Sequence, residues 1–162
     1  MQNHHKQQVS ERGRVAWDEY RTGLGLFAKQ RWKSAARHFG EAERRAARSD
    51  RNSQLYASYY GLALIRCGDI SGLNFCRHAA SAERKNATVF LNLTRAELSF
   101  SHRRRACNAV NAGLALEPWQ AELLEIRKVM GVRRPPLLSF LKRENLLNKW
   151  LGMITYRSYS HR

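Results

Sequence analysis

The stretch "RWKSAARHFGEAERRAARSDR", residues 31–51, decides how the chain folds. It holds seven Arg or Lys residues, one histidine and three acids, which suits a basic helix that contacts an anion. Its apolar residues, however, recur at intervals of three and four positions: Trp32, Ala35, Phe39 and Ala42. Such spacing places side chains on one face of a helix, and the basic residues fall largely off that face. The pattern therefore predicts a packing helix that carries its arginines largely on the outer side.

The same offsets recur twice more along the chain. The first segment holds Gly23, Leu26, Trp32, Ala35, Phe39 and Ala42. The second, 38 residues later, holds Gly61, Leu64, Ile70, Leu73, Arg77 and Ala80. The third, a further 33 residues on, holds Thr94, Glu97, Arg103, Ala106, Val110 and Gly113, followed by Leu114 and Pro118. Small residues allow two helices to cross closely while larger ones fill the space beside them, so the pattern predicts repeated helix pairs.

This pattern resembles the tetratricopeptide repeat (TPR), a helix–turn–helix unit of 34 residues. The resemblance covers about residues 14–118. The second segment departs from the TPR pattern at Leu73 and Arg77, and the third lacks both the glycine and the aromatic residue. The resemblance implies an all-α, TPR-like solenoid of about three repeats. A generic helical bundle with coincidental spacing is the alternative.

Three regions are expected: a flexible N-terminal arm over 1–13, a TPR-like helical repeat domain over 14–131, and a basic, apolar C-terminal tail over 132–162 that packs on the repeats. After Pro118, "WQAELLEIRKVMG" predicts a capping helix. Its apolar face is expected to hold Trp119, Leu123, Ile126 and Met130. The tail is similar to the C-terminal tail of uncharacterised bacterial TPR proteins, which indicates that repeats and tail form one module.

The chain carries 29 Lys or Arg residues against 13 acids, a formal net charge of +16, which implies attraction to an anionic partner. Residues 133–162 hold seven of these basic residues and a single acid, Glu144. No apolar run reaches transmembrane length and no signal peptide opens the chain, so we expect a cytoplasmic protein. The three cysteines lack metal-ligand spacing and are expected to be reduced thiols.

Enzymatic activity is not expected, nor is a cofactor or a metal. The six histidines form no HExxH arrangement, and Gly23-x-Gly25 lies within a predicted helix, where close packing explains it better than phosphate binding. Cys76 precedes Arg77 and His78, but neighbours in sequence point to different faces of a helix. An inert, half-buried thiol is therefore expected there.

The resemblance to TPR proteins implies a scaffold or adaptor that binds a partner protein or peptide in a concave groove lined by the first helix of each repeat. Carried over position by position, the expected partner-binding residues are Trp17, Tyr20, Arg21, Leu24, Phe27, Tyr59, Leu62, Arg66, Asn92 and Arg95. The alternative is that several of these positions are core between the first helices of successive repeats. Some TPR grooves clamp a terminal carboxylate with Lys, Asn and Arg, and Arg21, Arg66, Asn92 and Arg95 offer part of that chemistry. The remaining floor is apolar, so a partner segment or the chain's own tail is expected to cover it.

Two other classes of function stay open. A nucleic-acid- or anionic-surface-associated protein would use the charge, and its candidate anion-binding residues are Arg103, Arg104, Arg105, Lys142 and Arg143. The first three open a predicted helix, where positive charge opposes the helix dipole; either an anion relieves this penalty or the turn is solvated. A self-associating subunit would instead use the apolar tail.

Overall fold

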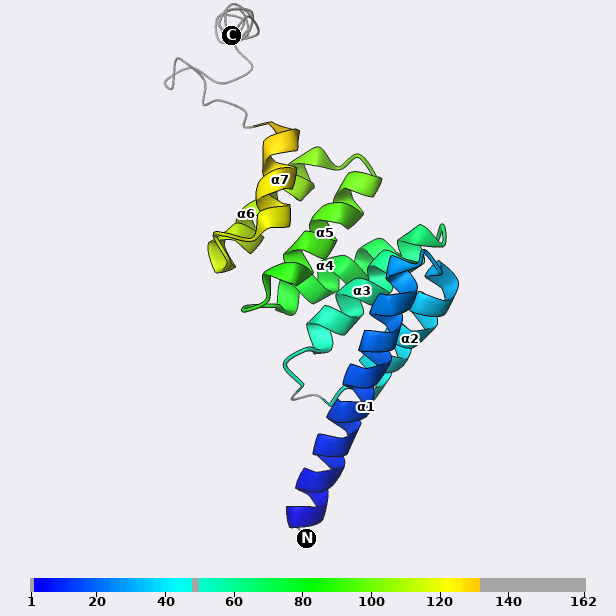
Figure 1. The fold of residues 1–162 in the computed structure, drawn as a ribbon. Helices are drawn as coiled ribbons and strands as arrows, with labels where there is room; N and C mark the ends of the chain where they lie inside the picture. Colours follow the sequence, from blue (N-terminus) through cyan, green and yellow to red (C-terminus); the bar gives the residue numbers. More distant parts are fainter. Residues whose placement is uncertain (1, 48–49, 132–162) are drawn as a thin grey trace, which may run out of the picture. The chain divides into compact units, whose positions relative to one another are not determined.

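The computed structural model describes residues 2–47 and 50–131, and every regular element in these ranges is an α-helix (Figure 1). The helices are α1 (Gln2–Ala28), α2 (Trp32–Arg45), α3 (Ser53–Arg66), α4 (Gly72–Ala82), α5 (Ala87–Ser99), α6 (Arg103–Leu116) and α7 (Ala121–Met130). The predicted packing of 132–162 on the repeats, self-association through that segment, and the candidate sites Lys142 and Arg143 lie outside the described residues.

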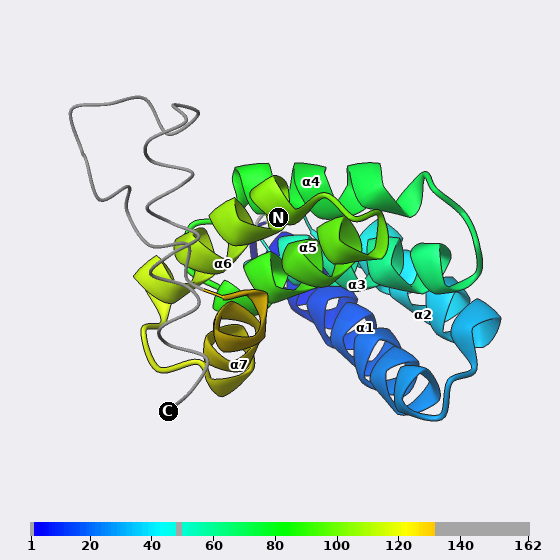
Figure 2. The ribbon, with the colours of Figure 1, turned by 90° about the horizontal axis from the view of Figure 1, so that it is seen from above.

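The seven helices are arranged as three pairs followed by a single helix. α1 packs on α2, α3 on α4 and α5 on α6, and α7 packs on α6. Successive pairs are joined through α2 against α3 and through α5 against both α3 and α4 (Figures 1 and 2). This arrangement confirms the predicted all-α architecture of three helix–turn–helix repeats with a capping helix. α1 begins at Gln2, within the expected N-terminal arm, and the flexibility of residues 1–13 stays a prediction.

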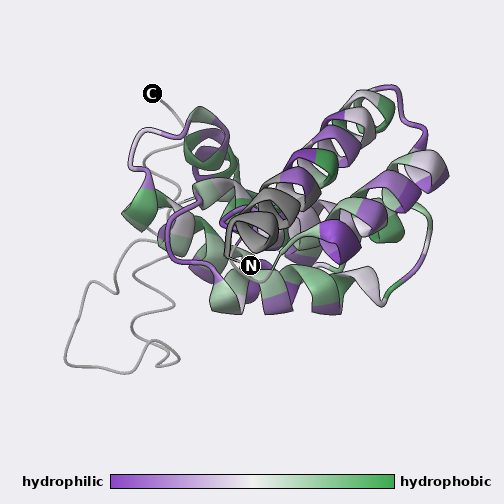
Figure 3. Cartoon of the chain, turned by 90° about the horizontal axis from the view of Figure 1, so that it is seen from below, coloured by the Kyte–Doolittle hydropathy of each residue, from purple (hydrophilic) through white to green (hydrophobic). Residues whose placement is uncertain are grey.

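The stretch quoted first folds as the packing helix α2. Ala35, Phe39 and Ala42 are buried there, and Phe39 lies at the centre of the largest hydrophobic cluster. The basic side chains of α2 point away from that cluster, and hydrophilic residues follow the outer sides of α1 and α2 (Figure 3). Two of them, Arg44 and Arg45, form ion pairs with Glu41 one turn earlier. Packing therefore accounts for α2 without a bound anion.

Glycines allow the helices of the first two pairs to cross closely, as predicted. A Cβ atom on Gly23 of α1 would lie 2.6 Å from the Phe39 ring of α2. A Cβ atom on Gly61 of α3 would lie 2.5 Å from the carbonyl oxygen of Gly72 in α4. In the third pair Thr94 takes the corresponding position, fully buried, with its hydroxyl donating to the Phe90 carbonyl at 2.8 Å. That bond satisfies its polar group in the core.

The first helix of each repeat ends in the same turn. Gln30, Gly68 and Ser101 all have positive φ, at 57°, 88° and 59°. The residue after each donates a backbone hydrogen bond of 2.9 Å to the carbonyl five positions earlier, at Leu26, Leu64 and Glu97. This is the Schellman arrangement that closes a helix with a left-handed residue. The spacing between the three turns equals that between the repeats, so the turn belongs to the repeat itself.

Because L side chains disfavour the left-handed region, Ser101→Gly is expected to raise the free energy of unfolding by about 1 kcal/mol. Urea unfolding monitored by circular dichroism measures this change. Ser99→Gly is the control, since Ser99 lies in the last turn of α5 and glycine should lower stability there by roughly 0.5 kcal/mol. Equal losses from both substitutions would contradict the assignment of the turn.

The capping helix corrects one prediction about its apolar face. α7 begins at Ala121, so Trp119 precedes it in the turn and is 88% exposed. Leu123 is fully buried, with Ile126 and Met130 partly buried beside it. The predicted face is therefore correct from Leu123 onward, and the sequence pattern extended the helix too far toward Pro118. No helix in the described ranges has the length and apolarity needed to cross a bilayer.

Candidate functional site

The first helices of the pairs and α7 form a surface that we call the helix-A face, made by α1, α3, α5 and α7. Three side-chain contacts connect these helices in order. The rings of Tyr20 and Tyr59 lie 5.5 Å apart between α1 and α3. Asn92 Nδ2 of α5 donates to Ser58 Oγ of α3 at 3.0 Å. Arg95 of α5 then forms an ion pair with Glu122 of α7. We call these side chains, together with Trp17 beside Tyr20, the row on the helix-A face. The row joins all four helices.

Aromatic rings occupy the α1 and α3 end of the row. Trp17 is 41% exposed, and its ring lies 5.3 Å from that of Tyr20, which is buried beneath it. Tyr59 is half-buried and contacts Phe39 with 5.3 Å between ring centroids. Burial raises the pKa of Tyr20, and it also raises the pKa of Tyr59 against the opposing field of Arg95. Both hydroxyls therefore stay protonated near neutral pH and can donate hydrogen bonds.

Asn92 stands at the middle of the row and is fully buried. Its amide nitrogen has a partner in Ser58, whose own hydroxyl donates to the Leu55 carbonyl at 2.8 Å. Its Oδ1 atom has no hydrogen-bond partner among the described residues. A buried acceptor without a partner costs free energy, and Asn92 carries this cost beneath the accessible side chains of the face.

Two of the three cationic residues predicted for this face, Arg95 and Arg66, have partners of their own. Arg95 is paired with Glu122, an acid that the repeat pattern did not single out because it lies 27 residues away. Arg66 lies over the ring of Trp32, with 5.6 Å from its guanidinium carbon to the ring centroid. Arg66 therefore belongs to the end of α3 beside α2, away from the row. Arg21 is exposed on α1.

The predicted apolar positions lie deeper than a groove surface. Leu62 is buried among Leu73, Cys76 and Ala96. Leu24 and Phe27 are partly buried against the core, and Phe27 also contacts Trp32 with 4.8 Å between centroids. Of the ten predicted partner-binding residues, Tyr20, Leu62 and Asn92 are buried and support the face from below. The accessible part of the row consists of Trp17, Tyr59 and Arg95 together with Glu122.

The predicted anion-binding residues at the start of α6 are all exposed. Arg103 donates to the Met130 carbonyl at the end of α7, at 2.9 Å, so it joins α6 to the capping helix. Arg104 and Arg105 form no ion pair with any described residue. The two arginines therefore place positive charge at the beginning of α6, as expected from the sequence.

A buried ionic cluster was not predicted. Glu97 of α5 is 2% exposed and accepts bonds from Arg77 Nε and Nη2 of α4, at 2.7 and 3.0 Å. His102 Nδ1 lies 2.7 Å from Glu97 Oε2, the oxygen that also accepts from Arg77 Nη2. Burial raises the pKa of Glu97, but the hydrogen bonds from Arg77 and His102 outweigh it and lower the pKa overall. Arg77 and Glu97 are two of the three charged departures from the repeat pattern, with Arg103, and here they neutralise each other.

The arrangement of helices is similar to that of known proteins. No family model and no curated protein matches the chain. Among solved structures, the first TPR domain of the human RPAP3 protein is similar with a TM-score of 0.61 and 14% identity, covering 73% of this chain and 91% of that one. The first TPR of Spaghetti (RPAP3), bound to the HSP90 peptide SRMEEVD, is similar with a TM-score of 0.59, 15% identity and the same coverage. The described helices therefore have the fold of a TPR domain, as the spacing predicted.

Proposed function

We propose that this chain is a non-enzymatic protein-interaction module, a scaffold or adaptor that binds an extended peptide of a partner protein across the helix-A face. The observation that carries the proposal is the accessible row from Trp17 through Tyr59 to Arg95 and Glu122, which spans four helices. The fold supports the proposal, because a similar TPR domain is known bound to the HSP90 peptide SRMEEVD.

The chemistry of the row favours a peptide that is apolar at one end and polar at the other. The exposed ring of Trp17 offers contact area to an apolar side chain. The half-buried Tyr59 offers its hydroxyl as a hydrogen-bond donor toward a peptide backbone. A carboxylate would compete with Glu122 for Arg95, so α7 limits the negative charge that this face accepts.

Replacing the accessible residues tests this proposal. The variant Trp17→Ala/Arg95→Ala removes the aromatic surface and the cation without touching the buried residues. Affinity capture from cells, followed by mass spectrometry with and without nuclease, is expected to lose the partner protein for this variant. Trp119→Ala is the control, because it removes an exposed tryptophan outside the row and should keep the partner. Retention of every nuclease-resistant protein by the double variant would refute the proposal.

A nucleic-acid- or anionic-surface-associated role is the second candidate, favoured by the +16 charge and by exposed Arg104 and Arg105. Such binding releases counterions, so affinity falls steeply as salt rises. The capture experiment separates the two, because proteins bridged by nucleic acid disappear on nuclease treatment. Elution of the chain from heparin at low salt would exclude this candidate.

A further inference from the structure

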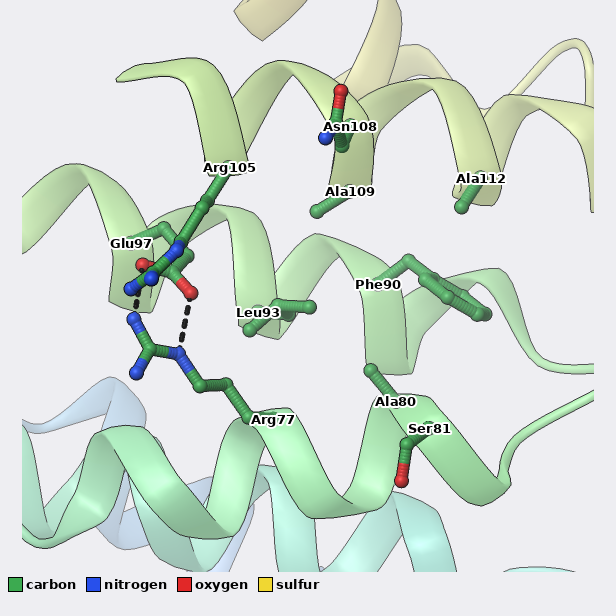
Figure 4. A pocket seen from close by; sticks show the side chains of 10 residues that line it. All are labelled: Arg77, Ala80, Ser81, Phe90, Leu93, Glu97, Arg105, Asn108, Ala109 and Ala112. Atoms are coloured by element: carbon green, nitrogen blue, oxygen red, sulfur yellow. Dashed lines mark hydrogen bonds and ion pairs between the residues drawn. The ribbon is translucent and has the colours of Figure 1, made fainter. Parts of the chain in front are cut away.

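Helices α4, α5 and α6 surround an open pocket of about 520 Å³ that shares no residue with the row on the helix-A face (Figure 4). Its floor is apolar. Phe90 and Leu93 of α5 are partly buried there, and Ala80 of α4 and Ala109 of α6 face them from either side. Small side chains on the two flanking helices leave the space above Leu93 open, so an added side chain could contact the floor without displacing any residue.

One end of the pocket is polar and positively charged. Figure 4 shows Arg77, Glu97 and Arg105 gathered there, one from each helix. The charge of Glu97 is compensated, because Arg77 donates to both its oxygens and His102 also contacts it. Arg105 is exposed and in no ion pair with the described residues, so its guanidinium adds an unbalanced positive charge.

The surroundings reinforce that charge. Neither α4 nor α6 contains an aspartate or a glutamate, whereas α6 begins with three arginines, Arg103–Arg105. Glu97 is the only acid among the residues that line the pocket. A ligand with carboxylates would therefore meet attraction at this end and no acidic side chain able to repel it from the two flanking helices.

We propose that this pocket is a second binding site, for an acidic peptide segment of a partner protein, with one aliphatic side chain seated on Leu93 and a neighbouring carboxylate bound by Arg105. The charge of the flanking helices selects the acidic segment, and the floor selects the apolar anchor. A nucleic acid fits less well, because binding of single strands relies on successive aromatic stacking platforms and Phe90 is the only aromatic residue in this lining. The site is separate from the helix-A face, so the chain would hold two peptide segments at once.

Fluorescence anisotropy with the full chain tests the site. The probe is a fluorescein-labelled short peptide of aspartates and glutamates with two leucines. The control peptide has the same sequence with serines in place of the leucines. Arg105→Glu is expected to weaken binding of the leucine peptide by about tenfold or more, the cost of one charge-assisted hydrogen bond. Arg104→Glu changes the net charge equally but lies outside the lining, so it is expected to weaken binding only about twofold through the general field.

Four outcomes would overturn the proposal. The first is no measurable binding of the leucine peptide to the unaltered chain. The second is an equal loss from Arg104→Glu and Arg105→Glu, and the third is equal affinity for the serine peptide, since both indicate non-specific charge attraction. The fourth is displacement of the peptide by a single-stranded oligonucleotide that itself binds less well to Arg105→Glu, which would assign the pocket to nucleic acid. Unchanged peptide binding by Trp17→Ala/Arg95→Ala is expected and distinguishes this site from the helix-A face.

Discussion

Substituting Gly61 by alanine is expected to lower the free energy of unfolding by more than about 3 kcal/mol, beyond the usual range for overpacking a core. The new Cβ would lie 2.5 Å from the Gly72 carbonyl oxygen, 2.8 Å from Cys76 Sγ and 3.0 Å from the Cys76 nitrogen. Two of these three atoms belong to the backbone of α4, so no side-chain rotation relieves the clash. α3 and α4 must separate, and the buried contacts of Leu62 and Leu73 weaken with them.

Urea unfolding followed by circular dichroism measures this loss, with Gly25→Ala as the matched control. Gly25 is an exposed glycine of α1 with no neighbouring atom within 4 Å of its would-be Cβ. There the higher helix propensity of alanine is expected to raise stability by up to about 1 kcal/mol. If both alanines raise stability alike, the close crossing of α3 and α4 is wrong.

The repeats could be predicted from the sequence, because close helix crossings require small residues and buried helix faces require apolar residues at three- and four-residue spacing. Gly23 and Gly61 lie at their crossings, and Phe39 packs where the three- and four-residue spacing placed it. The turns were only partly readable. Gly68 indicates its left-handed conformation directly, whereas Gln30 and Ser101 adopt the same conformation without a glycine to mark it. Their geometry follows from the helix pair that they close, which no short stretch of residues specifies.

The site was less predictable than the fold. The burial of each side chain and the identity of its ion-pair partner depend on residues that are distant in the sequence. The positions carried over from the TPR resemblance assigned Asn92 and Leu62 to the first helices of their pairs. Packing between successive pairs buries both residues. The partner of Arg95 is an acid on α7, outside the three repeats. The peptide-binding role of the face stays a proposal, whereas α1, α3 and α5 were predicted from the repeat spacing and α7 from its apolar pattern.

Arg77→Phe alone is expected to destabilise the protein strongly, and adding Glu97→Leu is expected to restore most of the loss. The first substitution leaves Glu97 buried without its bidentate partner, and breaking a buried pair in this way costs roughly 3–5 kcal/mol. The double variant replaces both charges by the apolar residues that the repeat pattern favours here, which is often neutral or stabilising. Glu97→Leu alone should cost less, because Arg77 is 34% exposed and its guanidinium can reach water through the adjoining pocket.

The double-mutant cycle, measured by urea unfolding, gives the coupling between the two positions. Strictly additive effects would show that Arg77 and Glu97 are independent departures from the repeat, contrary to their contact. A large coupling would show that Arg77 and Glu97 replace one apolar contact of the repeat by one ionic contact. The second and third repeats would then depart from the repeat pattern less than their sequences indicate.

The pH dependence of stability distinguishes the ionic contact from simple packing. Because the pKa of Glu97 is lowered below its ordinary value of 4.5, its contribution is present above that pH and is lost as the pH falls toward the lower folded-state pKa. The unaltered chain is therefore expected to lose more stability than Arg77→Phe/Glu97→Leu between neutral pH and about pH 3. Glu41, whose pKa is lowered by the hydrogen bond from Arg45 and by the charge of Arg44, is present in both proteins and cancels in the comparison. Identical acid profiles would mean that Glu97 contributes by its volume and not by its charge.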